Sequence, residues 1–205
     1  MSENEFNRIH CLFMNHEPAE AVRQLRDEFA DRLSGLFSGG HQLQPGNGAV
    51  DIRGVSEWDR VLAYLGLSLQ YNEEESSKAD NATQLIASVA ARIGLLMRVL
   101  EMSWRHLSTR KSFGIKTTRH QLVKAEFADI SSQAGLLLLQ WRMRLAIGDF
   151  EGVEADHWHI TVLTNRAEKL MGGHGYLLGA THTLSYLSMM IYSLYGKTAG
   201  HYAMP

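Results

Sequence analysis

The sequence is poor in cysteine and in excess charge, and each shortage excludes a class of protein. Cys11 is the single cysteine in 205 residues, so no disulfide can form within the chain and a reducing, cytoplasmic location is expected. The net charge is −2, with 20 Lys and Arg against 22 Asp and Glu, which argues against a nucleic-acid-binding surface. An apolar fraction of 45% with 20% charged residues is typical of a globular protein.

The sequence also lacks the patterns of a leader and of a membrane span. Residues Ser2 to Arg8 are polar and charged with no apolar run behind them, so no signal peptide is expected. The stretch Leu170–Gly196 contains no Asp, Glu, Lys or Arg and is long enough to cross a bilayer of about 30 Å. Because it is interrupted by glycine, serine, threonine and histidine, we expect instead a helix buried at a subunit interface.

Alternating apolar and polar residues are scarce, and the apolar spacing is helical almost throughout. Four long helices are expected. The first starts after Asp80 or Asn81 and has some 27 residues, the second follows a loop at about 112–118 and ends at Gly148, the third covers about 153–171, and the fourth follows the glycine cluster and runs through Leu194. Long helices with short connections predict an all-α, up-and-down four-helix bundle at 81–205. Residues 1–80 are expected to form a short helical N-terminal extension.

Within this extension, the sequence predicts two short helices and a loop, with no strand pattern. Pro18 can open the first helix, whose apolar positions include Val22, Leu25 and Phe29. A glycine-rich connection at 38–48 follows it, and a polar hinge is expected at 73–78.

Two short motifs carry candidate functional residues. The first is Arg110-Lys-Ser-Phe113-Gly114, followed by Gln121, and the second is Gly172-Gly173-His-Gly-Tyr. An arginine at a helix end can donate two hydrogen bonds to phosphate, and paired glycines let an anion approach the backbone. A plain structural role fits as well: a cation at a helix C-terminus, a core phenylalanine under a loop, and a glycine helix stop.

The order and spacing of these motifs, over residues 81–198, resemble the C-terminal helical domain of the acyl-CoA dehydrogenase family. The resemblance implies contacts with the adenosine pyrophosphate of FAD across a subunit interface. Lys169 stands where the family usually has Gln. The cofactor-binding residues that it implies are Arg110, Phe113, Gln121, Lys169, Gly172 and Gly173.

The same resemblance exposes a missing catalytic group. The family's catalytic Glu corresponds to Gly196 or, in some relatives, to Gln84, and neither side chain can take a proton. Tyr195 is a poor substitute, because a phenol has an ordinary pKa near 10. Family members normally carry a further helical domain and a β-domain before this one. We therefore predict no catalytic residue in this chain and an FAD shared with a partner.

Three functions remain open. The first is an accessory subunit that completes the FAD site of a larger acyl-CoA dehydrogenase-like subunit, or of a second copy, with no nucleic acid or membrane involved. The second is an inert helical scaffold or regulatory protein. The third and most remote is a metal-binding bundle, because Glu154 and His157 have the E-x-x-H spacing of di-iron sites and His159 follows them; however, no second copy of this spacing is found.

Overall fold

The computed structural model describes residues 1–29, 41–46, 56–57, 59–71 and 81–197. The expected polar hinge at 73–78 lies outside these residues. The expected glycine-rich connection is described only at 41–46. The helices are α1 (Glu3–Asn15), α2 (Pro18–Phe29), α3 (Arg60–Tyr64), α4 (Asn81–Thr109), α5 (Gln121–Ile147), α6 (Val153–Lys169) and α7 (Thr181–Ile191), with short helical turns η1 (Thr117–Arg119), η2 (Gly172–Tyr176) and η3 (Tyr192–Gly196). The strands are β1 (His41–Pro45), β2 (Ser56–Glu57), β3 (Leu67–Tyr71), β4 (Lys111–Ser112) and β5 (Ile115–Lys116).

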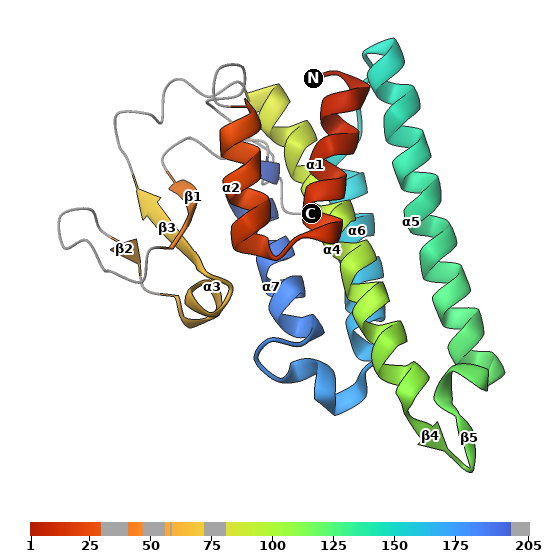
Figure 1. Ribbon diagram of the computed structural model, residues 1–205. Coiled ribbons are helices and arrows are strands. Elements are labelled where there is room, and N and C mark those ends of the chain that lie inside the picture. Colours follow the sequence, from red (N-terminus) through yellow and green to blue (C-terminus); the bar gives the residue numbers. More distant parts are fainter. Residues whose placement is uncertain (30–40, 47–55, 58, 72–80, 198–205) are drawn as a thin grey trace, which may run out of the picture.

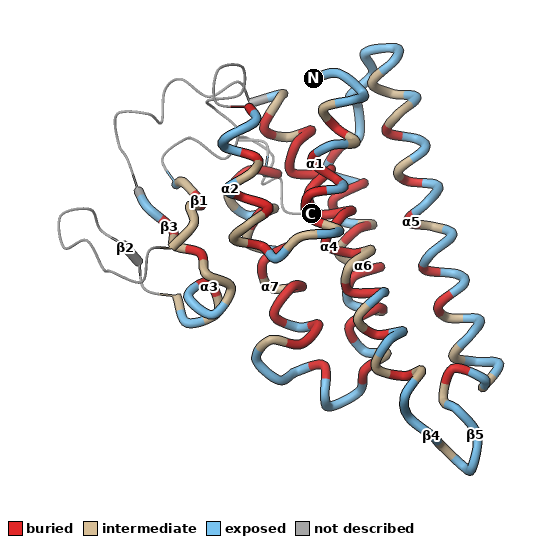
Figure 2. The backbone as a smooth tube through the Cα atoms, viewed as in Figure 1, coloured by how far each residue is buried: buried red, intermediate tan, exposed pale blue. Residues whose placement is uncertain are grey.

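The predicted four-helix bundle is confirmed, with α4 at its centre (Figure 1). α4 packs against α1, α5, α6 and α7, and Figure 2 shows it as the most continuously buried helix, although its C-terminal turns carry exposed residues such as Glu101, Trp104 and Arg105. Small residues on α4 allow this close packing, since Ala87, Ala90 and Ala91 are all fully buried. Among the described helices, none combines the length and apolar character that a membrane crossing requires.

A helix that the sequence reasoning missed, α1, packs along α4. Ser2 caps it with a capping box, in which its hydroxyl accepts the Glu5 N–H and the Glu5 carboxylate accepts the Ser2 N–H. Gly94 makes the close crossing possible, because a Cβ at this position would overlap the His10 carbonyl oxygen. Cys11 therefore lies on an ordered helix, with its side chain exposed.

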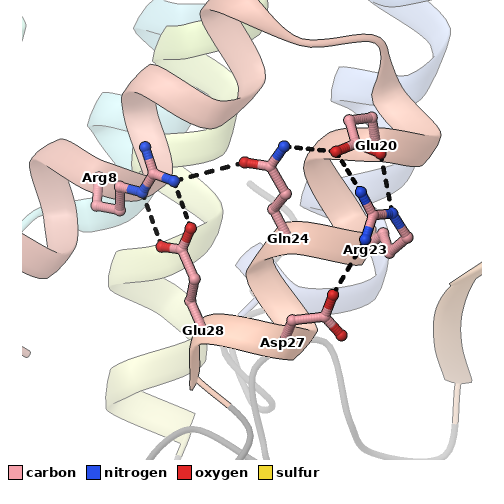
Figure 3. A network of polar contacts seen from close by, with 6 residues as sticks. All are labelled: Arg8, Glu20, Arg23, Gln24, Asp27 and Glu28. Atoms are coloured by element: carbon pink, nitrogen blue, oxygen red, sulfur yellow. Dashed lines mark hydrogen bonds and ion pairs between the residues drawn. The ribbon is translucent and has the colours of Figure 1, made fainter.

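The exposed sides of α1 and α2 are joined by a network of charged side chains (Figure 3). The Arg8 guanidinium pairs with the Glu28 carboxylate and donates a longer hydrogen bond of 3.4 Å to Gln24. On α2 itself, Arg23 bridges Glu20 and Asp27. Since these pairs are exposed, solvent screens them and each contributes little to the stability of the chain.

The expectation of no strands in the first 80 residues is wrong. A three-stranded antiparallel sheet in the order β1-β3-β2 pairs Leu43 with Leu69 and Pro45 with Leu67. The Tyr195 hydroxyl fastens this sheet to η3, because it accepts the Leu43 N–H and donates to the His41 carbonyl, both at 2.9 Å. The strands are short and their partners distant in sequence, so a local pattern did not reveal them.

Much of the uncharged segment after Leu170 packs within its own chain, although Tyr176, Leu177 and Leu178 are each more than 40% exposed. α7 packs on α4 and α6, and its buried face is formed by both apolar and small polar side chains. Those small polar groups are satisfied locally; for example, the Ser185 hydroxyl donates to the Thr181 carbonyl at 3.1 Å. The absence of charge in this segment therefore reflects burial in the bundle.

Candidate functional site

The first motif forms the end of α4 and the hairpin that follows it. Arg110 is exposed directly after α4, and its Nη1 lies 3.1 Å from the His106 Nε2. Phe113 and Gly114 form the two-residue turn between β4 and β5, and both have positive φ, 53° and 81°. Paired positive φ angles are those of a tight hairpin turn, a conformation that costs a bulky residue energy. The Phe113 side chain is 99% exposed, so it is not a core anchor.

The second motif lies between α6 and α7. Lys169 is the last residue of α6 and is exposed, and Gly172 has φ 58°. A Cβ at Gly172 or Gly173 would meet nothing within 4 Å, so the backbone here is open to an approaching group. Gly175 differs from them, because a Cβ there would lie 2.7 Å from the Thr181 hydroxyl; this glycine serves packing.

The two motifs lie at the same end of the bundle. The His106 and His174 rings stack with centroids 4.5 Å apart and planes 14° apart, which joins the last turns of α4 to η2. Figure 1 shows the β4–β5 hairpin and the α6–α7 connection together at the lower end of the molecule. Partial burial lowers the pKa of His106, and the nearby His174 and Arg110 lower it further.

All six residues implied by the resemblance are thus exposed at ends of elements near this tip. Gln121 begins α5, immediately after η1. The structure shows no direct contact that would lock the six into one pocket. The ring stack between His106 and His174 was not anticipated, although histidine at both positions was visible in the sequence.

The two positions that the resemblance assigns to a base lie elsewhere, in the buried centre of the bundle. A Cβ on Gly196 would come within 2.8 Å of both His157 Nε2 and Tyr192 Cδ2. Any side chain at residue 196 therefore displaces a fully buried ring. Gln84 is buried on α4 at 7% exposure.

Next to Gly196 lies a buried polar cluster that the sequence reasoning missed. Arg92 is fully buried on α4, and its guanidinium donates to the Ser188 hydroxyl at 3.1 Å and to the Thr161 hydroxyl at 2.7 Å. It also lies 2.9 Å from the His157 Nδ1 and 3.1 Å from the His157 carbonyl. The sequence contained one hint of this cluster, because Arg92 is a charged residue within the alanine-rich stretch of α4. Arg92 links α4, α6 and α7.

The hydrogen bonds around His157 fix its tautomer and exclude a nucleophilic pair. Because an arginine can only donate, His157 Nδ1 must accept from Arg92, and Nε2 carries the proton. Nε2 then donates to the Ser88 oxygen at 3.3 Å, and the Ser88 hydroxyl donates to the Leu85 carbonyl at 2.7 Å. His157 therefore has no lone pair directed at Ser88 and cannot activate it.

Burial determines the charge states in this cluster. Desolvation lowers the pKa of His157 to about 3, and the Arg92 charge contributes in the same direction. Desolvation also lowers the pKa of Arg92 to about 10, so it remains charged at neutral pH. The Tyr192 ring lies 5.1 Å from the guanidinium and adds a cation–π contact. The cluster holds one buried cation among neutral acceptors.

The metal-binding alternative finds no support in the described part of the chain, where no group of three or more His, Cys, Asp and Glu could hold an ion. His157 is engaged with Arg92, whereas His159 contacts Gln133 on α5 at 2.9 Å. The two histidines therefore face different sides of α6, as their spacing predicted.

Comparison with known proteins gives matches of fold only. No protein-family model and no curated protein matches the chain. Among solved structures, a chain of the electron transferring flavoprotein structure of Acidaminococcus fermentans matches with TM-score 0.49 and 16% identity, covering 75% of this chain and 44% of its own. A steroid ACAD variant matches with TM-score 0.49 and 20% identity, covering 77% and 52%. A glutaryl-CoA dehydrogenase from Mycobacterium smegmatis matches with TM-score 0.47 and 14% identity, covering 70% and 45%. All three TM-scores lie below 0.5, and this chain spans about half the length of the chains it matches.

Proposed function

We propose that this chain is a non-catalytic, accessory subunit of an acyl-CoA dehydrogenase-like flavoenzyme complex. Its tip, formed by the β4–β5 hairpin, η2 and the ends of α4 and α6, helps to bind the pyrophosphate of an FAD shared with a larger partner subunit. The observation that supports this proposal is the stacking of His106 on His174, which brings two motifs distant in sequence to one exposed end.

The chemistry of the tip suits a pyrophosphate. Arg110 offers a planar fork of N–H donors, and Lys169 adds a second exposed positive charge. The open backbone at Gly172 and Gly173 lets an anion approach peptide N–H groups without a side chain in the way. Gln121 can supply an amide donor at the start of α5.

Phe113 supports a contact with something outside this chain. It holds a positive φ at the hairpin turn while its ring is almost wholly in solvent. Within the chain the Phe113 ring meets the His120 ring edge-on, with centroids 6.4 Å apart. Backbone strain at so exposed a residue is typical of a binding site, and a cofactor or partner could cover the rest of the ring.

The missing base explains why we propose an accessory role rather than catalysis. Removing the α-proton of an acyl thioester requires a general base. Gly196 and Gln84 offer none, and the space beside Gly196 is filled by the neutral ring of His157. In this proposal the base, the flavin ring and the acyl pocket belong to the partner.

The test uses ADP and FAD as probes, titrated against the full chain by calorimetry at low and high salt. We expect weak, salt-sensitive ADP binding that Arg110→Ala reduces by about tenfold, as the loss of a charge-assisted contact implies. Arg105→Ala is the matched control, because Arg105 is an exposed arginine near the end of α4, five residues before Arg110, and its guanidinium pairs with Glu101. Equal ADP binding by the wild type and Arg110→Ala would contradict the proposal.

The competing function is an inert scaffold or regulatory protein of the same descent. It is favoured by the Arg92–His157 cluster, which fills the bundle centre with structural hydrogen bonds. If the scaffold hypothesis holds, Arg110→Ala leaves the flavin content of the purified complex unchanged. A loss of flavin from the complex on this substitution would instead support the accessory role.

A further inference from the structure

His106 holds the side chain of Arg110 at the tip of the molecule. The Arg110 Nη1 lies 3.1 Å from the His106 Nε2. Because a guanidinium can only donate, Nε2 must accept this hydrogen bond, and the neutral imidazole carries its proton on Nδ1. The Arg110 backbone is fixed separately, since its carbonyl accepts the Thr117 N–H at 2.9 Å. The guanidinium can therefore leave His106 while the hairpin stays in place.

A proton added to His106 is incompatible with this contact. The second proton of an imidazolium binds to Nε2, the same atom that accepts from Arg110, so two donors would face each other. Two positive charges would also lie within hydrogen-bond distance and repel each other. Protonation of His106 therefore releases the Arg110 guanidinium, whose N–H donors become available to a ligand.

His174 limits this site to one proton at a time. Its exposed ring stacks on the half-buried ring of His106, with centroids 4.5 Å apart. Two imidazolium rings at this distance repel each other, so the pair titrates as a unit and takes up one proton before the other. Partial burial lowers the pKa of His106, and its charged or titratable neighbours, His174 and Arg110, lower it further. In the ligand-free chain at pH 7 the neutral imidazole is thus favoured.

The segments that form the tip contain no carboxylate to balance an added proton. Residues 102–125 and 169–183 include no Asp or Glu. The acids that border these ranges are engaged in the contacts Glu101–Arg105, Glu126–Arg166 and Glu168–His182. The same two ranges carry seven cations, namely Arg105, Arg110, Lys111, Lys116, Arg119, Lys124 and Lys169. A proton on His106 adds to this positive charge, and an anion from outside the chain offsets its cost.

We propose that His106 belongs to the anion site of the tip and that a phosphate group binds there together with one proton. Neutral His106 holds Arg110, whereas protonated His106 releases it, and the ligand oxygens then accept hydrogen bonds from both the imidazolium and the guanidinium. This inference rests on the proposed function, because it concerns the same pyrophosphate site. It adds His106 and His174 to that site, together with a dependence of binding on pH.

Thermodynamic linkage gives the sign of this dependence. A bound phosphate raises the pKa of His106, so between the two pKa values the bound chain carries more protons than the free chain. Affinity therefore rises as the pH falls through this window. One linked proton changes the affinity by at most about tenfold per pH unit.

The test titrates ADP-ribose into the full chain by calorimetry at pH 8, pH 7 and pH 6. This probe contains a pyrophosphate diester and no phosphate monoester, whose own pKa of about 6 would mask the effect. We expect binding to be about fivefold tighter at pH 6 than at pH 8. Proton uptake should appear as different binding heats in buffers that differ in ionisation enthalpy.

Two histidine variants identify the titrating group. His106→Gln retains an acceptor for Arg110 but cannot take up a proton, so it should bind ADP-ribose equally at pH 6 and pH 8. The matched control is His159→Gln on α6, because His159 contacts Gln133 and lies outside the tip. This variant should keep the pH dependence of the wild type.

Nuclear magnetic resonance follows the same proton without relying on heats. The His106 ring signals are those absent from the spectrum of His106→Gln. In the free chain they should titrate with a pKa below the ordinary value of about 6.5, and saturating ADP-ribose should raise this pKa. An equal pKa with and without ADP-ribose would show that no proton is coupled to binding.

The outcomes separate this inference from the proposed function. Equal ADP-ribose binding at pH 6 and pH 8, or a pH dependence that survives His106→Gln, overturns the inference; the accessory role still stands if Arg110→Ala weakens binding. The inference is supported, and the accessory role contradicted, if binding depends on pH but Arg110→Ala leaves the flavin content of the complex unchanged. No binding at any pH contradicts both.

Discussion

The Arg92 guanidinium donates to His157 Nδ1 across 2.9 Å at the centre of the bundle, with both side chains fully excluded from solvent. This contact joins α4 to α6 and sets the imidazole tautomer, so that Nε2 donates toward Ser88. A buried charge with neutral partners is costly to create but also costly to disturb, since removing either side chain leaves a buried polar atom of the other without its partner. The contact therefore governs the stability of the chain and, through His157, its response to pH.

Replacing Arg92 with Ala should destabilise the chain severely. The substitution leaves a cavity and leaves His157 Nδ1 and the Ser188 hydroxyl without their partner. We expect a loss of roughly 3 kcal/mol in the free energy of unfolding, measured by urea denaturation. Arg105→Ala, at an exposed site on the same helix, should stay within about 0.5 kcal/mol. Similar midpoints for the two variants would show that the cluster is not structural.

The chain should lose stability in mild acid because two histidines are buried uncharged. The folded-state pKa is lowered to about 3 for His157 and to about 4 for His10, in both cases mainly by desolvation. Below pH 6.5 the unfolded chain takes up these protons and the folded chain does not, so stability falls as the pH falls towards 4. Each histidine contributes a slope of about 1.4 kcal/mol per pH unit in that window.

The measurement is the urea midpoint at intervals from pH 7 to pH 4. His157→Gln keeps a hydrogen-bond acceptor for Arg92 but cannot titrate. The urea midpoint of this variant should therefore fall less steeply with falling pH than that of the wild type, by the contribution of one histidine. If the wild type and His157→Gln lose stability in parallel, His157 is not the responsible group.

The sequence predicted the bundle well because each long helix carries its own apolar periodicity. The buried face of α5, with Phe127, Ile130 and Leu137, is legible in a short window. Met143 belongs to the apolar pattern of the same helix, yet it is 64% exposed. An apolar pattern does not distinguish a face covered by the chain itself from a face left exposed.

The sheet and the buried cluster could not be derived in this way. Leu43 meets Leu69, and Arg92 meets His157, only through long-range packing. Similarly, the sequence supplied the two motifs at the tip, whereas only the structure showed that His106 stacks on His174. The local apolar pattern predicts individual helices, whereas contacts between distant elements depend on how the whole chain packs.

Adding a side chain at residue 196 should not restore a base. The Cβ of Gly196→Ala would lie 2.8 Å from His157 Nε2, so overpacking should cost roughly 1–3 kcal/mol. Gly196→Glu adds a buried carboxylate to the same collision and should remain without dehydrogenase activity. A double-mutant cycle with His157→Ala measures the coupling, and we expect the second change to relieve most of the first. Additive costs would show that the two positions do not collide.

Gly94, the one glycine in α4, should not tolerate a side chain. A Cβ there would overlap the His10 carbonyl oxygen and lie 3.0 Å from Phe13 Cβ, so Gly94→Ala must push α1 away from α4. We expect a loss of roughly 1–3 kcal/mol, read as a lower urea midpoint. The matched control is Gly135→Ala on α5, where a Cβ meets nothing within 4 Å and helix propensity predicts a gain of up to about 1 kcal/mol. A loss of stability for Gly94→Ala together with a gain for Gly135→Ala would support the close α1–α4 crossing. An unchanged stability of Gly94→Ala would refute it.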